Sequence, residues 1–234
     1  MESRNRLVIV ASILVLVSLG LMIPMFLPAN PSSLDLTLLG QIDTGGATWD
    51  VKVIADIAYV LDENDGLLLI DVSDATNPTV ISSYDDGGTP TALEVIGSYV
   101  YVADRFEGLE IIDVSDSSNP TEIGVYGGSG AAYDIQVIGD LAFVGDWNDG
   151  LVILDVSDPT EPSYVSRYQT AGSCIFVRVV GQLGYIIDHQ DYSSGLRILN
   201  ISDVLHPIQL GTHMPNGAIL WNPVVLGNSI YCGN

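Results

Sequence analysis

The chain has 234 residues and carries 29 acidic against 7 basic side chains, which gives a net charge of −22. Surfaces that bind nucleic acid need clustered lysine and arginine, so this charge argues against a nucleic-acid partner. Hydrophobic residues make up 47% and charged residues 15% of the sequence, a composition typical of a folded chain with a large core and not of a disordered one.

A long apolar run lies near the N-terminus. Residues 7–27 contain no charged side chain, and about 20 apolar residues suffice to span the hydrocarbon core of a bilayer. Arg4 and Arg6 precede the run, and the next basic residue is Lys52. The positive-inside rule therefore predicts residues 1–6 as a cytoplasmic stub, 7–27 as a transmembrane helix that holds the protein in the membrane, and the rest outside.

A cleaved secretory signal peptide is the alternative interpretation of this run. Signal peptides have a shorter apolar region of roughly 7–15 residues that ends in an Ala-x-Ala-type site, whereas Pro28-Ala29-Asn30-Pro31 follows here. Both interpretations place the domain outside the cytoplasm, anchored at the cell surface or secreted. Residues 28–35 are then a linker, stiffened by proline, and residues 36–234 are the folded domain.

One phrase recurs four times in this domain. The copies are 69–74 (Leu-Ile-Asp-Val-Ser-Asp), 111–116, 153–158 and 198–203. Their third residues are Asp71, Asp113, Asp155 and Asn200, so the steps are 42, 42 and 45 residues. A period of this size, built from short apolar runs and turn residues, is typical of the four-stranded blade of a β-propeller.

Each repeat predicts four strands in the same order. An inner strand comes first, and a two-residue turn, the length that β-hairpins favour, joins it to a second strand. The second strand ends in Asp. A polar loop then reaches a Gly and a third strand that ends in the repeated phrase. A proline precedes the fourth strand and suits an edge, because it donates no ladder hydrogen bond. The predicted inner strands are 49–54, 91–96, 133–138 and 175–180.

The two ends of the domain depart from the repeat. Residues 36–43 align with a fourth strand, and we expect them to complete the last blade of the ring. Residues 220–234 match only the first two strands of a fifth blade, which would leave an open sheet edge. We therefore expect an all-β propeller with four full blades and a partial fifth, a fragment of a larger ring. A five-bladed ring that lacks one strand is the alternative.

The repeated phrase resembles the LVIVD-repeat family, as do the preceding Tyr-Val-x-Asp motif (Tyr59 to Asp62 in the first repeat) and the proline that follows. The resemblance covers residues 36–234. It implies a β-propeller on the surface of bacteria or archaea. Most members have no assigned activity, so the resemblance implies a fold and a location and supplies no catalytic residues.

Two sets of acidic residues recur in every repeat. The third residue of the phrase is interpreted as an acceptor that fixes a turn or joins two blades, because a buried carboxylate needs donors. The second set closes the second strand. Its members are read either as caps of the loops that follow or as a calcium site, since calcium takes oxygen ligands; no other cofactor is predicted. The predicted metal ligands are Asp62, Asp104, Asp146 and Asp188.

Residues that differ between repeats are the better candidates for a ligand site. The loops after the second strands and the entries to the inner strands share one end of a propeller. The predicted ligand-binding residues at this end are Trp49, Arg105, Phe106, Tyr133, Trp147, His189, Tyr192 and Trp221. Exposed aromatic rings suit a sugar or a protein partner, while the alternative is that several of them pack between blades.

The sequence thus favours a non-catalytic module that binds a protein or a glycan at the cell surface. A calcium-dependent binder or a hydrolytic enzyme that uses the same loops is the alternative. The chain contains no Gly-x-Ser-x-Gly or His-Glu-x-x-His motif, which weakens the hydrolytic interpretation. Cys174 and Cys232 fall in adjacent predicted blades, and a disulfide between them is left open.

Overall fold

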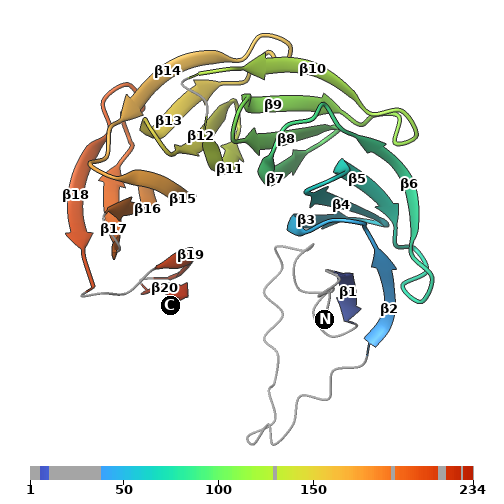
Figure 1. The fold of residues 1–234 in the computed structure, drawn as a ribbon. Coiled ribbons are helices and arrows are strands. Elements are labelled where there is room, and N and C mark those ends of the chain that lie inside the picture. Colours follow the sequence, from blue (N-terminus) through green and yellow to red (C-terminus); the bar gives the residue numbers. More distant parts are fainter. Residues whose placement is uncertain are drawn as a thin grey trace, which may run out of the picture. The chain divides into compact units, whose positions relative to one another are not determined.

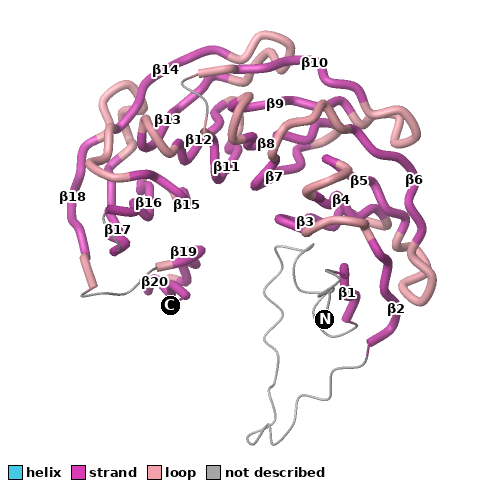
Figure 2. Tube along the Cα trace, in the orientation of Figure 1, coloured by secondary structure: helices cyan, strands magenta, loops and turns pink. Residues whose placement is uncertain are grey.

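The computed structural model describes residues 6–10, 38–128, 131–190, 193–215, 220–227 and 229–233. The chain forms two compact units, Met1–Asp85 and Asp86–Asn234. Every regular element in the described ranges is a β-strand, and short turns join the strands within each sheet (Figure 1, Figure 2).

Among its described residues, the unit Met1–Asp85 contains one four-stranded antiparallel sheet and one strand pair. The sheet runs in the order β3 (Thr48–Ile54), β4 (Ile57–Asp62), β5 (Gly66–Asp71) and β6 (Thr79–Tyr84). The pair consists of β1 (Arg6–Val10) and β2 (Leu38–Asp43). Val60, Leu68 and Ile70 form the core of the unit, and Ile42 of β2 packs against it.

Strand β1 differs from the prediction for the N-terminus. Residues 7–10 are expected to begin a transmembrane helix, whereas in the structure they belong to β1, where Leu7 lies opposite Ile42. The physical reason is that Val and Ile in this apolar run also fit the pleated surface of a strand. Residues 11–37, which hold the rest of the predicted span and the linker, lie outside the described residues. The described part of the chain contains no helix long and apolar enough to cross a membrane.

Strand β2 has the environment of a fourth strand, as its alignment predicts. A Cβ atom at Gly40 would collide with the carbonyl oxygen of Ala75, in the turn before β6. Gly124, at the same repeat position, meets the carbonyl oxygen of Pro159 in the other unit. The hydrogen-bonded neighbour of β2 in the structure is β1, and the completion of the last blade by residues 36–43 stays a prediction.

The unit Asp86–Asn234 contains three four-stranded antiparallel sheets and one two-stranded sheet among its described residues. The first sheet is β7 (Pro90–Ile96), β8 (Tyr99–Asp104), β9 (Gly108–Asp113) and β10 (Thr121–Tyr126). The second is β11 (Ala132–Ile138), β12 (Leu141–Asp146), β13 (Gly150–Asp155) and β14 (Ser163–Tyr168). The third is β15 (Ser173–Val180), β16 (Leu183–Gln190), β17 (Ser193–Asn200) and β18 (Ile208–His213). The pair is β19 (Trp221–Leu226) and β20 (Ser229–Gly233).

The sheets of this unit stack face to face, as propeller blades do. Leu109 and Ile111 of β9 pack with Ile135 of β11 and Val144 of β12 in one apolar cluster. In Figure 1 the first strands β7, β11 and β15 lie on the inner side of this unit, and β10, β14 and β18 follow its outer rim. The structure thus confirms the predicted repeat of four-stranded antiparallel blades and the predicted strand order within each.

The repeated phrase fixes the turn that follows the third strand. Oδ1 of Asp71 accepts a hydrogen bond from the amide of Ser73 at 2.8 Å. The carboxylates of Asp113 and Asp155 accept the equivalent amides at 2.8 Å, and the Asn200 side-chain oxygen does so at 2.9 Å. The Ser73 hydrogen bonds lower the pKa of Asp71. The turn-fixing interpretation of this position is therefore confirmed, and an amide serves because only an acceptor is needed.

Candidate functional site

The loops after the second strands are fastened to the starts of the inner strands. The amide of Arg105 donates to the carbonyl oxygen of Thr89 at 3.2 Å, and the amide of Trp147 donates to that of Ala131 at 2.9 Å. This places the side chains that follow each recurring Asp beside the residues that enter β7 and β11. The predicted neighbourhood of these loops and inner-strand entries is therefore present in the structure.

A bulge at the start of each inner strand directs one residue out of the regular ladder. The register between β11 and β12 shifts between Ala132 and Asp134, so Tyr133 is the extra residue. The same shift between Thr48 and Asp50 makes Trp49 the extra residue of β3. Bulges commonly re-aim a side chain next to a functional site, and here they present aromatic rings at the loop end of the sheet.

Arg105, Tyr133 and Trp147 meet in what we name the Tyr133 cluster. The guanidinium carbon of Arg105 lies 4.6 Å from the centroid of the Tyr133 ring. The Tyr133 and Trp147 ring centroids lie 5.0 Å apart at an interplanar angle of 33°. Trp147 remains 41% exposed, and neighbouring Phe106 is 76% exposed. Side chains from two sheets thus build one partly exposed aromatic surface with a cation on it.

His189, Trp221 and Phe176 form a second group, the Trp221 cluster. The Trp221 ring centroid lies 5.9 Å from that of Phe176 and 6.1 Å from that of His189. Trp221 is 50% exposed, and Nε2 of His189 is buried without a hydrogen-bond partner. The sequence does not single out Phe176. One feature of the sequence could have indicated it: Phe176 occupies the inner-strand position that Asp134 holds in the preceding repeat, so an aromatic ring replaces a carboxylate there.

The remaining predicted ligand-binding residues are placed as follows. Trp49 belongs to the Met1–Asp85 unit and is 46% exposed there. Tyr192 lies outside the described residues. The enlarged loop that contains it is largely an extension of the hairpin, because β16 and β17 continue their pairing to Gln190 and Ser193.

The recurring aspartates at the ends of the second strands are buried and bind backbone amides. Oδ1 of Asp104 accepts the amides of Phe106 and Glu107 at 2.7 and 3.0 Å, while Oδ2 accepts the amide of Thr89. Asp62 and Asp146 likewise cap the loops that follow them. For Asp62 and Asp104, the bonds to Gly46 and Thr89 also hold the loop against the entry to the inner strand. A calcium site built from Asp62, Asp104, Asp146 and Asp188 stays a prediction.

Asp188 differs because its loop is longer and its partner is a cation. Nη2 of Arg197 lies 2.7 Å from Oδ2 of Asp188. Asp188 is fully buried, and the hydrogen bond with Asp188 raises the pKa of Arg197. The pair shows that this blade position accommodates a buried charge when an opposite charge is supplied.

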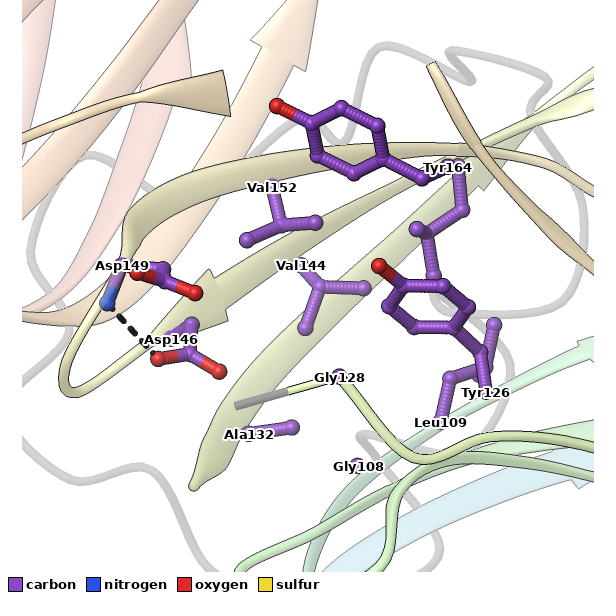
Figure 3. A pocket seen from close by; sticks show the side chains of 11 residues that line it. Gly108, Leu109, Tyr126, Gly128, Ala132, Val144, Asp146, Asp149, Val152 and Tyr164 are labelled. Atoms are coloured by element: carbon purple, nitrogen blue, oxygen red, sulfur yellow. Dashed lines mark hydrogen bonds between the residues drawn. The ribbon is translucent and has the colours of Figure 1, made fainter. Parts of the chain in front are cut away.

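A small pocket lies at the same end of the second sheet, where Asp146, Asp149 and Val152 face Tyr126 and Gly128 (Figure 3). Its volume is about 30 Å³, and one water molecule needs about 10–15 Å³ of such space. The pocket therefore has room for a few water molecules and is small for an organic ligand.

The two cysteines are free thiols in the structure. Cys174 is buried in β15, and burial raises the pKa of its thiol. Cys232 lies on β20 and is partly exposed. The disulfide that the sequence leaves open is therefore absent between these described residues.

The sequence comparisons agree with this repeating structure. The LVIVD repeat model matches residues 45–86, 87–127 and 129–170. The chain belongs to the LVIVD-repeat family. The three matches include the sheets β3–β6, β7–β10 and β11–β14, while the fourth copy of the phrase at 198–203 lies beyond them. No curated protein matches this LVIVD-repeat chain in sequence.

Solved structures resemble the LVIVD-repeat fold at low sequence identity. The computationally designed Ika8 protein is 8% identical with a TM-score of 0.64, over 80% of this chain and 55% of that one. A functionally unknown protein from Desulfotomaculum acetoxidans DSM 771 is 14% identical with a TM-score of 0.61, over 83% and 65%. The β-propeller domain of Myceliophteria thermophila Cps50 (Swd1) is 13% identical with a TM-score of 0.63, over 79% and 64%. The chain thus spans between about half and two thirds of these structures, and the likeness shows a β-propeller repeat fold.

Proposed function

We propose that this LVIVD-repeat protein is a non-catalytic binding module that works outside the cytoplasm and captures a protein or a glycan. The observation that carries the proposal is the Tyr133 cluster. Arg105, Tyr133 and Trp147 come from two different sheets, yet their side chains contact one another at the loop end. The fold of a blade does not require these three residues, because other residue types occupy the same positions in other blades.

The chemistry of the cluster suits recognition. Tyrosine, tryptophan and arginine are the residue types that carry most of the binding energy at protein interfaces, and flat aromatic faces also stack on sugar rings. The recurring aspartates cap the loops that carry Arg105 and Trp147, and backbone hydrogen bonds fasten these loops to the starts of the inner strands. Loops that are already ordered lose less conformational entropy on binding, so this fastening favours affinity.

The wider setting of the module is also part of the proposal. The four-stranded sheets are blades of a propeller ring, with β19 and β20 as the first strands of a further blade. The run of residues 7–27 anchors the protein in the cytoplasmic membrane, and residues 7–10 then leave the pairing with β2 that the structure shows. The support is the uncharged run itself and the position of Arg4 and Arg6 before it.

The experiment is a binding screen with the full chain on an array of immobilised bacterial and host glycans. Wild type is compared with Trp147→Ala and with Tyr164→Ala, which removes an aromatic ring that is 51% exposed on the outer strand β14. The proposal expects binding that Trp147→Ala abolishes and Tyr164→Ala retains. Binding that survives both substitutions would place the ligand elsewhere, and an array without any signal would leave a protein as the partner class.

A further inference from the structure

Glu110 on β9 occupies a position that is apolar or basic in the other repeats. Counted from the Gly that opens the third strand, the equivalent residues are Leu68, Val152 and Arg197. The cross-strand neighbours of Glu110 are Val102 on β8 and Val125 on β10. The packing of two valines does not explain a carboxylate between them, so the role of Glu110 must come from other groups nearby.

The blade β15–β18 shows how the same position can be balanced. There Arg197 lies 2.7 Å from Asp188, and the two charges cancel. The equivalent of Asp188 in the blade β7–β10 is Asp104, and its neighbour is Glu110 instead of an arginine. The same two positions therefore hold charges of opposite sign in one blade and of equal sign in the other.

The blade β7–β10 also lacks a second arginine that neutralises an acidic residue in a neighbouring blade. Asp149, in the loop before β13, forms an ion pair with Arg167 of β14 at 2.6 Å. The equivalent of Asp149 in the blade β7–β10 is Glu107, while the position of Arg167 is held by Val125. Glu107 thus keeps the negative charge of this repeat position without the arginine that accompanies it in the next blade.

Asp86 adds a further acid. The equivalent residues in the other repeats are Thr44, Gly128 and Thr170. In the structure one carboxylate oxygen from each of Asp86, Glu107 and Glu110 lies within 4.8 Å of the other two. Two of these acids thus replace neutral or basic residues of the repeat, and all three converge on one point.

One oxygen of the Glu110 carboxyl group is buried without a partner. Glu110 is 4% exposed and its Oε1 has no hydrogen bond, while the side chain also hydrogen-bonds with that of Asp86. The charged groups that act on it, namely Asp86, Asp104 and Glu122, are all acidic. An ionised carboxylate in such a place is costly unless an opposite charge is supplied.

We propose that Asp86, Glu107 and Glu110 bind a calcium ion. Calcium is ligated by carboxylate oxygens at about 2.3–2.6 Å, so opposite ligand atoms lie up to about 5 Å apart. The three oxygens lie within 4.8 Å of one another, so a single calcium ion can contact all three. The exposed Asp86 and Glu107 give the ion access from solvent, and Glu110 supplies the inner ligand. The proposal does not depend on the binding of a glycan or protein.

The next repeat provides an internal comparison. Its residues at the positions of Asp86, Glu107 and Glu110 are Gly128, Asp149 and Val152, and all three line the pocket of about 30 Å³ (Figure 3). Only one of these residues is acidic, and Arg167 pairs with it. The repeat scaffold therefore offers the space at this place, and one blade fills it with three carboxylates.

The experiment measures thermal unfolding and calorimetric binding of the full chain with calcium chloride after treatment with a chelator. Sodium chloride at matched ionic strength controls for screening, because a protein of net charge −22 attracts any cation. Three variants are compared with wild type. Glu110→Val introduces the residue of the next blade, Glu107→Gln changes an exposed ligand, and Asp65→Asn changes the exposed acid at the position of Glu107 in the first repeat.

The proposal expects one calcium ion per chain and a rise in the melting temperature with calcium. Both effects are lost in Glu110→Val and weakened in Glu107→Gln, and both persist in Asp65→Asn. Glu110→Val is expected to fold and to be more stable than wild type without calcium, since it removes a buried oxygen that has no hydrogen-bond partner. Absence of binding in wild type, or equal stabilisation of wild type and Glu110→Val, would overturn the proposal.

Discussion

Arg105 lies over the ring of Tyr133, with its guanidinium carbon 4.6 Å from the ring centroid, and so joins the loop after β8 to the start of β11. A double-mutant cycle of Arg105→Ala and Tyr133→Leu is expected to show a coupling energy of about 0.5–1 kcal/mol, the size of a partly exposed cation–π contact. Urea unfolding of the four proteins measures it. Additive effects would show that the two side chains do not interact.

Asp134 on β11 connects two neighbouring sheets. Its Oδ2 accepts the amide of Val177 at 2.8 Å and pairs with Nη1 of Arg178 at 2.9 Å, both on β15. Asp134→Ala leaves a partly buried cation and a buried amide without this partner, so we expect a loss of about 3 kcal/mol in the free energy of unfolding. Asp134→Asn keeps an acceptor and should lose less. Equal stability of Asp134→Ala and wild type in chemical denaturation would refute this role.

Ala55 occupies a turn position that Gly97, Gly139 and Gly181 hold in the other blades. Its φ is 52°, in the left-handed region, against 60° for Gly97. A side chain in this region costs about 1–2 kcal/mol, part of which the greater flexibility of unfolded glycine offsets. We therefore expect Ala55→Gly to stabilise the Met1–Asp85 unit by about 0.5–1 kcal/mol. Gly97→Ala is the matched substitution and should lower the stability. A lower melting temperature for Ala55→Gly, or a higher one for Gly97→Ala, would contradict this role of the left-handed turn position.

The N-terminal run is expected to anchor the protein. In bacterial cells the full chain should remain in the membrane fraction after carbonate washing, because residues 7–27 stay in the bilayer. A variant without residues 7–27 should be soluble. Added protease should digest the domain on spheroplasts without lysis. A mature protein that begins after residue 27 would support the signal-peptide alternative instead, and protection of the domain from protease would contradict export.

The repeat itself could be predicted from the sequence, because the same pattern of apolar and turn residues recurs in each blade. The strand order, the turn held by Asp71 and its equivalents, and the loop cap at Asp104 all follow from local hydrogen-bonding rules. The N-terminal strand β1 could not be predicted, since the apolar residues 7–10 fit a membrane helix as well as a strand.

The details of the candidate sites depended on contacts between strands distant in sequence. Phe176 joins Trp221 only because β15 and β19 are neighbours. The convergence of Asp86 with Glu110 was likewise hidden, although the departure of Glu110 from the aliphatic pattern was visible in the aligned repeats. Comparison of equivalent positions for charge, and not only for aromatic residues, is the signal that would have found it.

The central claim is that the Tyr133 cluster binds the ligand. The most direct measurement is the dissociation constant of the full chain for the strongest glycan found on the array, for wild type, for the double variant Tyr133→Ala/Trp147→Ala and for the control Tyr164→Ala. Loss of a central aromatic pair is expected to weaken binding by at least about 30-fold, the effect of 2 kcal/mol, while the control should bind as wild type does. Equal dissociation constants for wild type and the double variant would contradict the account.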